Sequence, residues 1–308
     1  MDAFLLADGG AALVHAACFA YVFTDADVLG ASIPVDLVRV AFGNTTEANR
    51  YYRVHEVLSF SMPSVAFLHG VVAFVTALAH VFVYFPVHAR LRETVWCRRR
   101  ALSLRWVEYS ITCTIMTIAS ALSSGTSDLN YVVGTACTGV CLQAMGFAVE
   151  QTKATPIWRF FFAVGCVLEL GLAWTVVWNN LSSVGGSVHH WIETAVYMFY
   201  YGLFALNCFV DAAYAVPFYT TDWVYTMLSL TSKVAFFWIQ IGDVDRKIHG
   251  ESPWTSVQIY VLGCALPLVL LCAGVVWRPR SVDVGRASAA PPNGYVSRLD
   301  AVLQAKLL

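Results

Sequence analysis

The stretch WTSVQIYVLGCALPLVLLCAGVVW runs from residue 254 to residue 277 without one charged side chain. About 20 apolar residues suffice for a helix to cross the roughly 30 Å of hydrocarbon in a bilayer, so this stretch predicts a transmembrane helix. The whole chain of 308 residues agrees, because it is 58% hydrophobic and 13% charged, whereas soluble domains carry roughly 25% charged residues. Its formal net charge of −1 gives no electrostatic reason to expect a nucleic-acid partner. We therefore expect an all-α membrane protein whose partner is the lipid bilayer.

Working outward from this stretch, we find seven more segments that are long and apolar enough to span a membrane. The predicted spans are 8–29, 62–86, 103–124, 129–150, 157–178, 191–216, 220–241 and 254–277. The link over residues 30–61 is long and polar, and we expect a small hairpin in it. It contains a glycosylation sequon at Asn44, and a second sequon begins at Asn180.

The spans divide the chain into three parts. Residues 1–241 form a seven-helix bundle, residues 242–278 form an outer loop and an additional transmembrane helix, and residues 279–308 form a mobile tail. The link between the second and third spans is rich in arginine, which marks it as cytoplasmic; it holds Arg90, Arg92, Arg98, Arg99 and Arg100. Counting back two spans puts the N-terminus in the cytoplasm. Eight spans put the basic C-terminal tail there too, whereas seven would leave it outside.

Two charged residues stand out within the predicted spans, where an unpaired charge costs several kcal/mol and so marks a functional candidate. Lys233 lies near the middle of the seventh span, and Glu108 lies in the inner half of the third. Burial disfavours the ammonium form of a lysine, and an unprotonated amine attacks an aldehyde to form a Schiff base. A protonated Schiff base needs a nearby anion, which Glu108 can supply. On this chemistry alone, a structural Lys–Glu pair joining two helices explains the residues equally well.

The local sequence favours the Schiff base. Residues 105–110, Arg-Trp-Val-Glu-Tyr-Ser, together with Met116, resemble the third-helix signature of heliorhodopsins, and residues 228–233, Leu-Ser-Leu-Thr-Ser-Lys, resemble their retinal-lysine helix. Further matches are Trp238 and Gln240 beyond the lysine, and Gly146 and Glu150 at the family's Gly-x-x-x-Glu. The resemblance covers roughly residues 8–241 and implies a seven-helix rhodopsin-like bundle with a cytoplasmic N-terminus. The eighth span is not part of the family pattern.

The resemblance implies that Lys233 binds all-trans-retinal and that Glu108 is its primary counterion. It also implies an inner polar cavity beside the Schiff base, in which histidines take part in proton rearrangement; its members are Ser229, Arg105, His15, Thr76 and His80. Each histidine could instead be a core residue bonded to a nearby carbonyl or hydroxyl group. The resemblance further implies a homodimer.

Retinal needs a slot walled by flat apolar groups. The pocket candidates are Trp106, Tyr109, Met116, Gly146, Trp174, Tyr200, Phe204 and Trp238. Tryptophans such as Trp174 and Trp178, one turn apart, could equally be lipid-facing residues of an aromatic belt.

The sixth span carries a polar stripe. At about 100° per residue, its five members stay within roughly 40° of one line; they are Glu193, Tyr197, Tyr200, Asn207 and Asp211. Glu169 adds an acid in the fifth span. Intramembrane acids often mark ion routes, which favours a proton path opened by retinal isomerisation. Alternatively, Glu193 and Asp211 lie hydrated at the two interfaces while the tyrosines face retinal.

These features predict a light-activated photoreceptor, either with a light-gated proton conductance or as a sensor that signals to an unknown partner without ion transport. A receptor coupled to G proteins would have its N-terminus outside, and an eight-span transporter could use the Lys–Glu pair for substrate. Retinal-dependent colour would separate both from the photoreceptor. No nucleophile–base constellation or metal motif stands in the sequence, so we expect neither an enzyme nor a metal site.

Overall fold

The computed structural model describes residues 3–24, 33–41, 53–62, 64–86, 104–123, 126, 128–182, 188–214 and 218–276. All of these lie in one compact unit, Met1–Val276. The predicted tail, the arginine-rich link used to orient the chain and the sequon at Asn44 lie outside the described residues.

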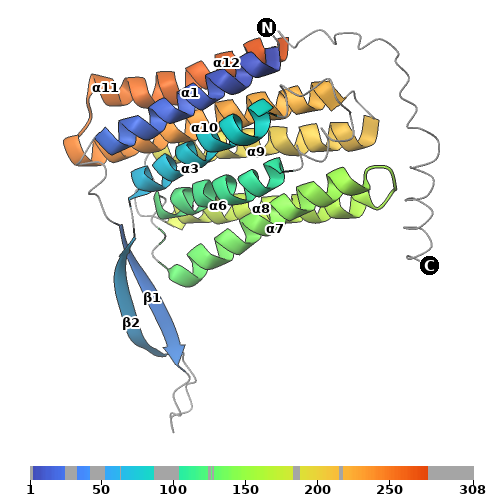
Figure 1. Cartoon of the computed structure of the whole chain (residues 1–308). Coiled ribbons are helices and arrows are strands. Elements are labelled where there is room, and N and C mark those ends of the chain that lie inside the picture. Colours follow the sequence, from blue (N-terminus) through green and yellow to red (C-terminus); the bar gives the residue numbers. More distant parts are fainter. Residues whose placement is uncertain are drawn as a thin grey trace, which may run out of the picture. The chain divides into compact units, whose positions relative to one another are not determined.

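Eight helical rods make up the described bundle (Figure 1). In chain order they are α1 (Ala3–Thr24), α3 (Val65–Ala79) with η1 (His80–Tyr84), α6 (Arg105–Ser123), α7 (Leu129–Thr152), α8 (Trp158–Ser182), α9 (Val188–Tyr214), α10 (Phe218–His249), and α11 (Pro253–Ser256) with η2 (Val257–Ala265) and α12 (Leu266–Val276). Seven of the rods are long and apolar enough to cross a membrane. The other rod is α6, whose many polar side chains are buried among its neighbours. The chain is therefore an integral, multi-pass, all-α membrane protein, as predicted.

The predicted hairpin is present between α1 and α3. Strands β1 (Ile33–Ala41) and β2 (Arg53–Met62) pair antiparallel, with a register irregularity between Arg39 and Val40. It is a local addition to the link between two helices, and the membrane-spanning part is helical throughout.

Two helices have a boundary that differs from the prediction by five residues or more. Helix α10 continues to His249 instead of ending at residue 241, because Asp243 pairs with Arg246 and with Lys247 at 2.7 Å each, one turn further along. It ends where Gly250 adopts a positive φ of 83°. Helix α1 begins at Ala3 instead of residue 8, so Asp8 lies inside the helix and not at its end.

Two rods contain a π-helical stretch, and each stretch ends two residues before a proline. The stretch η1 precedes Pro86, and η2 precedes Pro267. Proline has no N–H to donate to the preceding turn, and a wider turn is one way for a helix to accommodate it. The first of these stretches carries His80 and Tyr84, so the bulge sets how both side chains enter the bundle.

The last rod packs closely on α10, the helix that carries Lys233. A Cβ at Gly263 would lie 2.6 Å from Cγ1 of Ile239, and one at Gly274 would overlap the side chain of Met227. The indole nitrogen of Trp223 donates to the Gly274 carbonyl at 2.8 Å. These contacts enclose α10, whose membrane-spanning window is 78% buried inside the protein.

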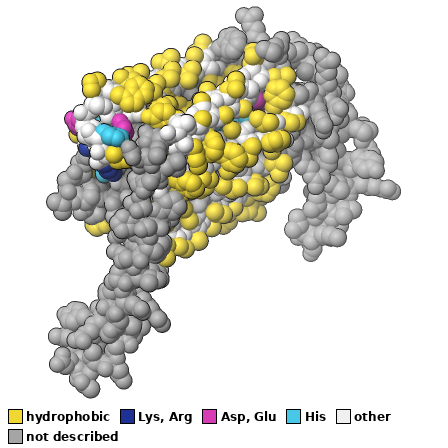
Figure 2. Space-filling view, turned by 60° about the vertical axis from the view of Figure 1, so that its left-hand side comes forward, with side chains coloured by type: hydrophobic (Ala, Val, Ile, Leu, Met, Phe, Trp, Pro, Cys, Tyr) yellow, Lys and Arg dark blue, Asp and Glu magenta, His cyan; other side chains and the backbone are white. Residues whose placement is uncertain are grey.

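The outside of the bundle is apolar and its inside is partly polar. Figure 2 shows hydrophobic side chains over most of the described surface, with charged groups and histidines gathered mainly at one end. Phe82, Val167 and Leu170 are each more than 60% exposed, whereas Thr76, Thr112 and Ser120 are fully buried. This inversion of the usual soluble pattern suits a lipid surround.

Candidate functional site

Lys233 and Glu108 meet in the interior of the bundle. Lys233 projects from α10 and Glu108 from α6, and their side chains are 3% and 7% exposed. The distance from Lys233 Nζ to Glu108 Oε1 is 2.5 Å. The ammonium also donates to Ser229 Oγ, one turn earlier on α10, at 2.9 Å. The three residues that the sequence placed at one centre are therefore adjacent.

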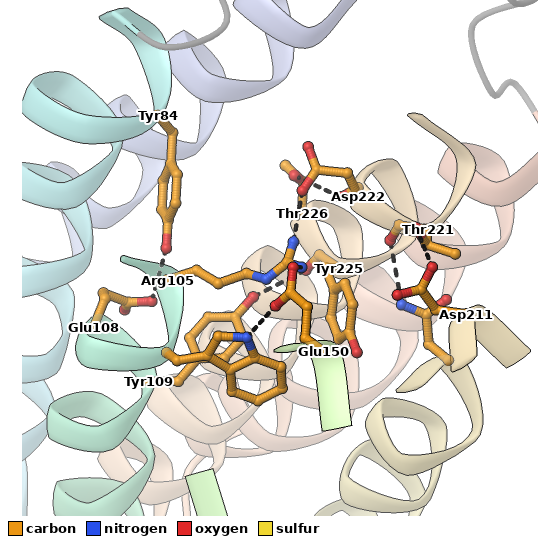
Figure 3. A network of polar contacts seen from close by, with 12 residues as sticks. Tyr84, Arg105, Glu108, Tyr109, Glu150, Asp211, Thr221, Asp222, Tyr225 and Thr226 are labelled. Atoms are coloured by element: carbon orange, nitrogen blue, oxygen red, sulfur yellow. Dashed lines mark hydrogen bonds and ion pairs between the residues drawn. The ribbon is translucent and has the colours of Figure 1, made fainter. Parts of the chain in front are cut away.

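Hydroxyl groups surround the Glu108 carboxylate. Thr76 donates to Oε1 at 3.0 Å, Thr112 donates to the same oxygen at 3.1 Å, and Tyr84 donates to Oε2 at 3.3 Å. Figure 3 shows the Tyr84 side chain reaching across to Glu108. Each of these bonds favours the ionised form of the acid, so the site is built to keep an anion beside the Lys233 nitrogen.

A cavity of about 800 Å³, counting its open mouth, adjoins Lys233. Six of the predicted pocket residues line it, namely Trp106, Tyr109, Met116, Gly146, Tyr200 and Phe204. An amine at the wall of an aromatic slot fits retinal, which needs both a lysine and flat apolar walls.

The close contact between α6 and α7 at the wall of this cavity requires a glycine at position 146. A Cβ built at Gly146 on α7 would overlap the ring of Trp106 on α6. Only glycine lets the indole lie flat against α7. The Trp106 indole nitrogen in turn donates to Glu150, which lies on α7 one turn after Gly146. The glycine and the glutamate of the Gly-x-x-x-Glu pattern thus hold the same tryptophan.

A family model for heliorhodopsin matches residues 9–244. The chain belongs to the heliorhodopsin family. It is thus a light-sensing rhodopsin with a retinal chromophore and several membrane-spanning helices. The match ends within α10, so the last rod, Pro253–Val276, lies beyond the family's pattern. A search of curated proteins found no match.

An arginine-centred network lies near Glu108 in this heliorhodopsin (Figure 3). The Arg105 guanidinium, 5% exposed, lies 2.6 Å from Asp222 and 3.0 Å from Glu150. It also stacks over the Tyr225 ring, 4.3 Å from the centroid. The sequence placed Arg105 in the polar cavity, but Asp222 was not predicted to accompany it. Asp222 lies in the first turns of α10, where the sequence alone suggests an acid at the membrane interface.

The two predicted cavity histidines lie together, and they have an acid that sequence reasoning missed. His15 and His80 are each less than 3% exposed, and their rings stack with centroids 6.3 Å apart. His80 Nδ1 lies 3.1 Å from Asp8 Oδ1, and the Asp8 side chain is fully buried. Asp8 is the first residue of the span predicted from the sequence, and an acid at a helix end would be hydrated. Because the helix begins at Ala3, Asp8 instead lies within it.

Two of the residues predicted to line the retinal pocket do not line the cavity. Trp174 is 62% exposed and contacts Trp178, with ring centroids 6.2 Å apart, so it faces outward as the alternative interpretation had it. Trp238 contacts Tyr21 and Phe237 instead of lining the cavity. Aromatic side chains cover several faces of these helices, and spacing alone does not show which face meets the ligand.

The polar stripe of α9 is buried along its whole length. None of its members exceeds 8% exposure; they are Glu193, Tyr197, Tyr200, Asn207 and Asp211. Ser123 donates to Glu193 at 3.0 Å, and the Lys153 ammonium lies 2.7 Å from Asp211. Both acids are thus buried and bonded to partners in the protein, and they are not well hydrated as the alternative interpretation had it.

Between the two acids, Asn207 donates to the Thr221 carbonyl at 3.2 Å. Tyr197 stacks on Tyr201 with centroids 4.2 Å apart. Glu169 on α8 lines the large cavity. Tyr200 of the stripe lines the same cavity, which adjoins Lys233. The stripe therefore passes beside this cavity, with Glu193 towards one end of α9 and Asp211 towards the other.

Proposed function

We propose that this heliorhodopsin carries all-trans-retinal on Lys233, with Glu108 as the counterion. The observation that carries the proposal is the 2.5 Å contact between the two side chains beside an aromatic cavity. A protonated Schiff base on the Lys233 nitrogen would keep the charge pairing with Glu108, and a buried cation needs such a partner.

Retinal supplies the photochemistry, because light isomerises it. The protein's own residues control the charge and the proton. Glu108 holds the positive charge at the Lys233 nitrogen, and Ser229 accepts a hydrogen bond from the same atom. After light, the Lys233 nitrogen releases its proton toward the polar cluster of α1, α3 and α6, and thermal recovery returns it. Among the residues that the structure describes, we find no pair that would make this transfer one-way, and we propose a photoreceptor, not a pump or an enzyme.

Lys233→Ala tests the proposal. Purified protein treated with retinal should lose its visible absorbance, because no amine remains to hold the chromophore. Ser229→Ala is the matched control, because it changes a neighbour of Lys233 and leaves the amine; it should stay coloured. A visible band that survives in Lys233→Ala would place the chromophore on another residue.

A second candidate function is a light-gated proton conductance along α9. The buried stripe with Glu193 and Asp211 beside the large cavity favours it, since intramembrane acids commonly mark proton routes. The ion pair of Asp211 with Lys153 would have to open for conduction. Whole-cell voltage clamp with retinal present tests it.

A light-evoked current that reverses near the proton equilibrium potential, and that Glu193→Gln or Asp211→Asn abolishes, would establish conductance. No current from a coloured protein at the cell surface would leave the sensor that signals to a partner. We also propose a homodimer with both termini in the cytoplasm. Cross-linking in membranes and labelling of epitope tags on intact cells test these two points.

A further inference from the structure

A continuous series of polar side chains leads away from Lys233 to a buried acid on α1. Tyr84 donates to Glu108 at 3.3 Å, and its ring meets the His80 ring edge-on, with centroids 5.0 Å apart. His80 in turn lies 3.1 Å from Asp8. The series links α10, α6, η1 and α1.

Asp8 is an unusual residue for a membrane-spanning helix. It is 1% exposed and lies within the apolar segment Leu5–Thr24. Carboxyl groups at such positions are expensive and mostly serve ion or proton transfer. Three carboxyl groups near Lys233 are paired with cations: Glu108 with Lys233, and Glu150 and Asp222 with Arg105. Asp8 instead pairs with histidine, the side chain best suited to exchange a proton near neutral pH.

The geometry of His80 fixes the direction of this exchange. A neutral imidazole has one N–H and one lone pair. Because Asp8 accepts from Nδ1, the lone pair is on Nε2, which is buried and has no hydrogen-bond partner among the described residues. His80 also lines a small cavity together with Tyr84 and Ser229, with space for about one water molecule. Water in such a polar space can bridge the Lys233 side of the cluster to Nε2.

We propose that Asp8 is the final acceptor of the proton that the Lys233 nitrogen releases, received through His80. A proton arrives at His80 Nε2 from the cavity, and the proton on Nδ1 passes to Asp8 Oδ1. His80 ends neutral with its proton on Nε2, Asp8 becomes a neutral acid, and the reverse steps restore the resting state. The Glu108 carboxylate is already occupied by hydrogen bonds from three hydroxyl groups and by the contact with Lys233.

This inference rests on the proposed function and adds the identity of the acceptor. The test is light-minus-dark infrared spectroscopy of the retinal-loaded protein in membranes. Wild-type protein should show a new carbonyl stretch of a protonated carboxylic acid, sensitive to deuterium oxide, that rises as the Lys233 nitrogen loses its proton. Asp8→Asn should remove the band. Glu193→Gln, which changes a buried acid bonded to Ser123, should keep it.

Asp8→Glu separates a proton acceptor from a structural residue. It keeps an acid at the end of a side chain one methylene longer, so the band should remain with a changed frequency, also if Asp8→Asn does not assemble. A band unaltered in both variants, or one lost only in Glu108→Gln, would overturn the assignment, as would deprotonation of the Lys233 nitrogen with no carboxyl band. Wild-type protein that stays colourless with retinal would instead refute the proposed function itself.

Discussion

Glu108→Gln removes the anion beside the Lys233 nitrogen and keeps the size and shape of the side chain. The two groups are in direct contact at 2.5 Å, and their charges are each spread over several atoms, so an effective separation of about 4 Å applies. At that separation and an effective dielectric constant of about 20, the attraction is about 4 kcal/mol. With 1.36 kcal/mol per pH unit, the variant should lose the proton from its retinal linkage about three pH units lower than wild type. Its absorbance in the protonated form should move to the red.

The assay is a visible absorbance titration of purified, dark-kept protein across pH. Glu193→Gln is the control, because it neutralises a buried acid that contacts Ser123 and not Lys233, and its titration should match wild type. A midpoint for Glu108→Gln within one pH unit of wild type, with no red shift, would refute Glu108 as the counterion.

Three further substitutions test the surroundings of the site. Gly146→Ala should lower retinal occupancy, because its Cβ overlaps the Trp106 ring, whereas Gly134→Ala on the same helix should not, because nothing lies within 4 Å of its Cβ and it does not line the cavity; visible absorbance per protein measures both. Arg105→Gln should destabilise the fold by about 3–5 kcal/mol, because two buried carboxylates lose their cation, and thermal loss of the visible band should then occur at a lower temperature. Gly263→Ala should cost about 1–3 kcal/mol by forcing a methyl group against α10, and normal stability would contradict the close packing of the last rod.

The residues most readily found from the sequence were those whose burial is costly. Lys233 and Glu108 stood out because a charge within an apolar span needs a partner, and the structure brings the two together. The helices were found for the same reason, since the bilayer demands long apolar segments. Helix α6 was among the predicted spans as well, although it is less apolar than the seven rods that qualify by composition in the structure.

Other parts of the site depend on depth and helix rotation, which a single sequence does not give. Asp8 and Asp222 both lie near an end of a predicted span, which suggests acids at the membrane interface. In the structure both are buried, Asp8 beside a histidine and Asp222 beside an arginine. Trp174 and Trp238 share their composition and spacing with residues that line the cavity, and only packing separates them. The π-helical turn that aims His80 and Tyr84 has a sequence signal in Pro86, which could have been noticed.

The enclosure of α10 has a consequence for how the bilayer can act on the chromophore. With 78% of its spanning window buried, and with the last rod packed along it, the helix carrying Lys233 has little contact with lipid. Changes in membrane thickness, tension or lipid composition therefore have to pass through neighbouring helices before they reach the retinal linkage. The colour of the protein should consequently be nearly the same in detergent, in thin bilayers and in thick ones.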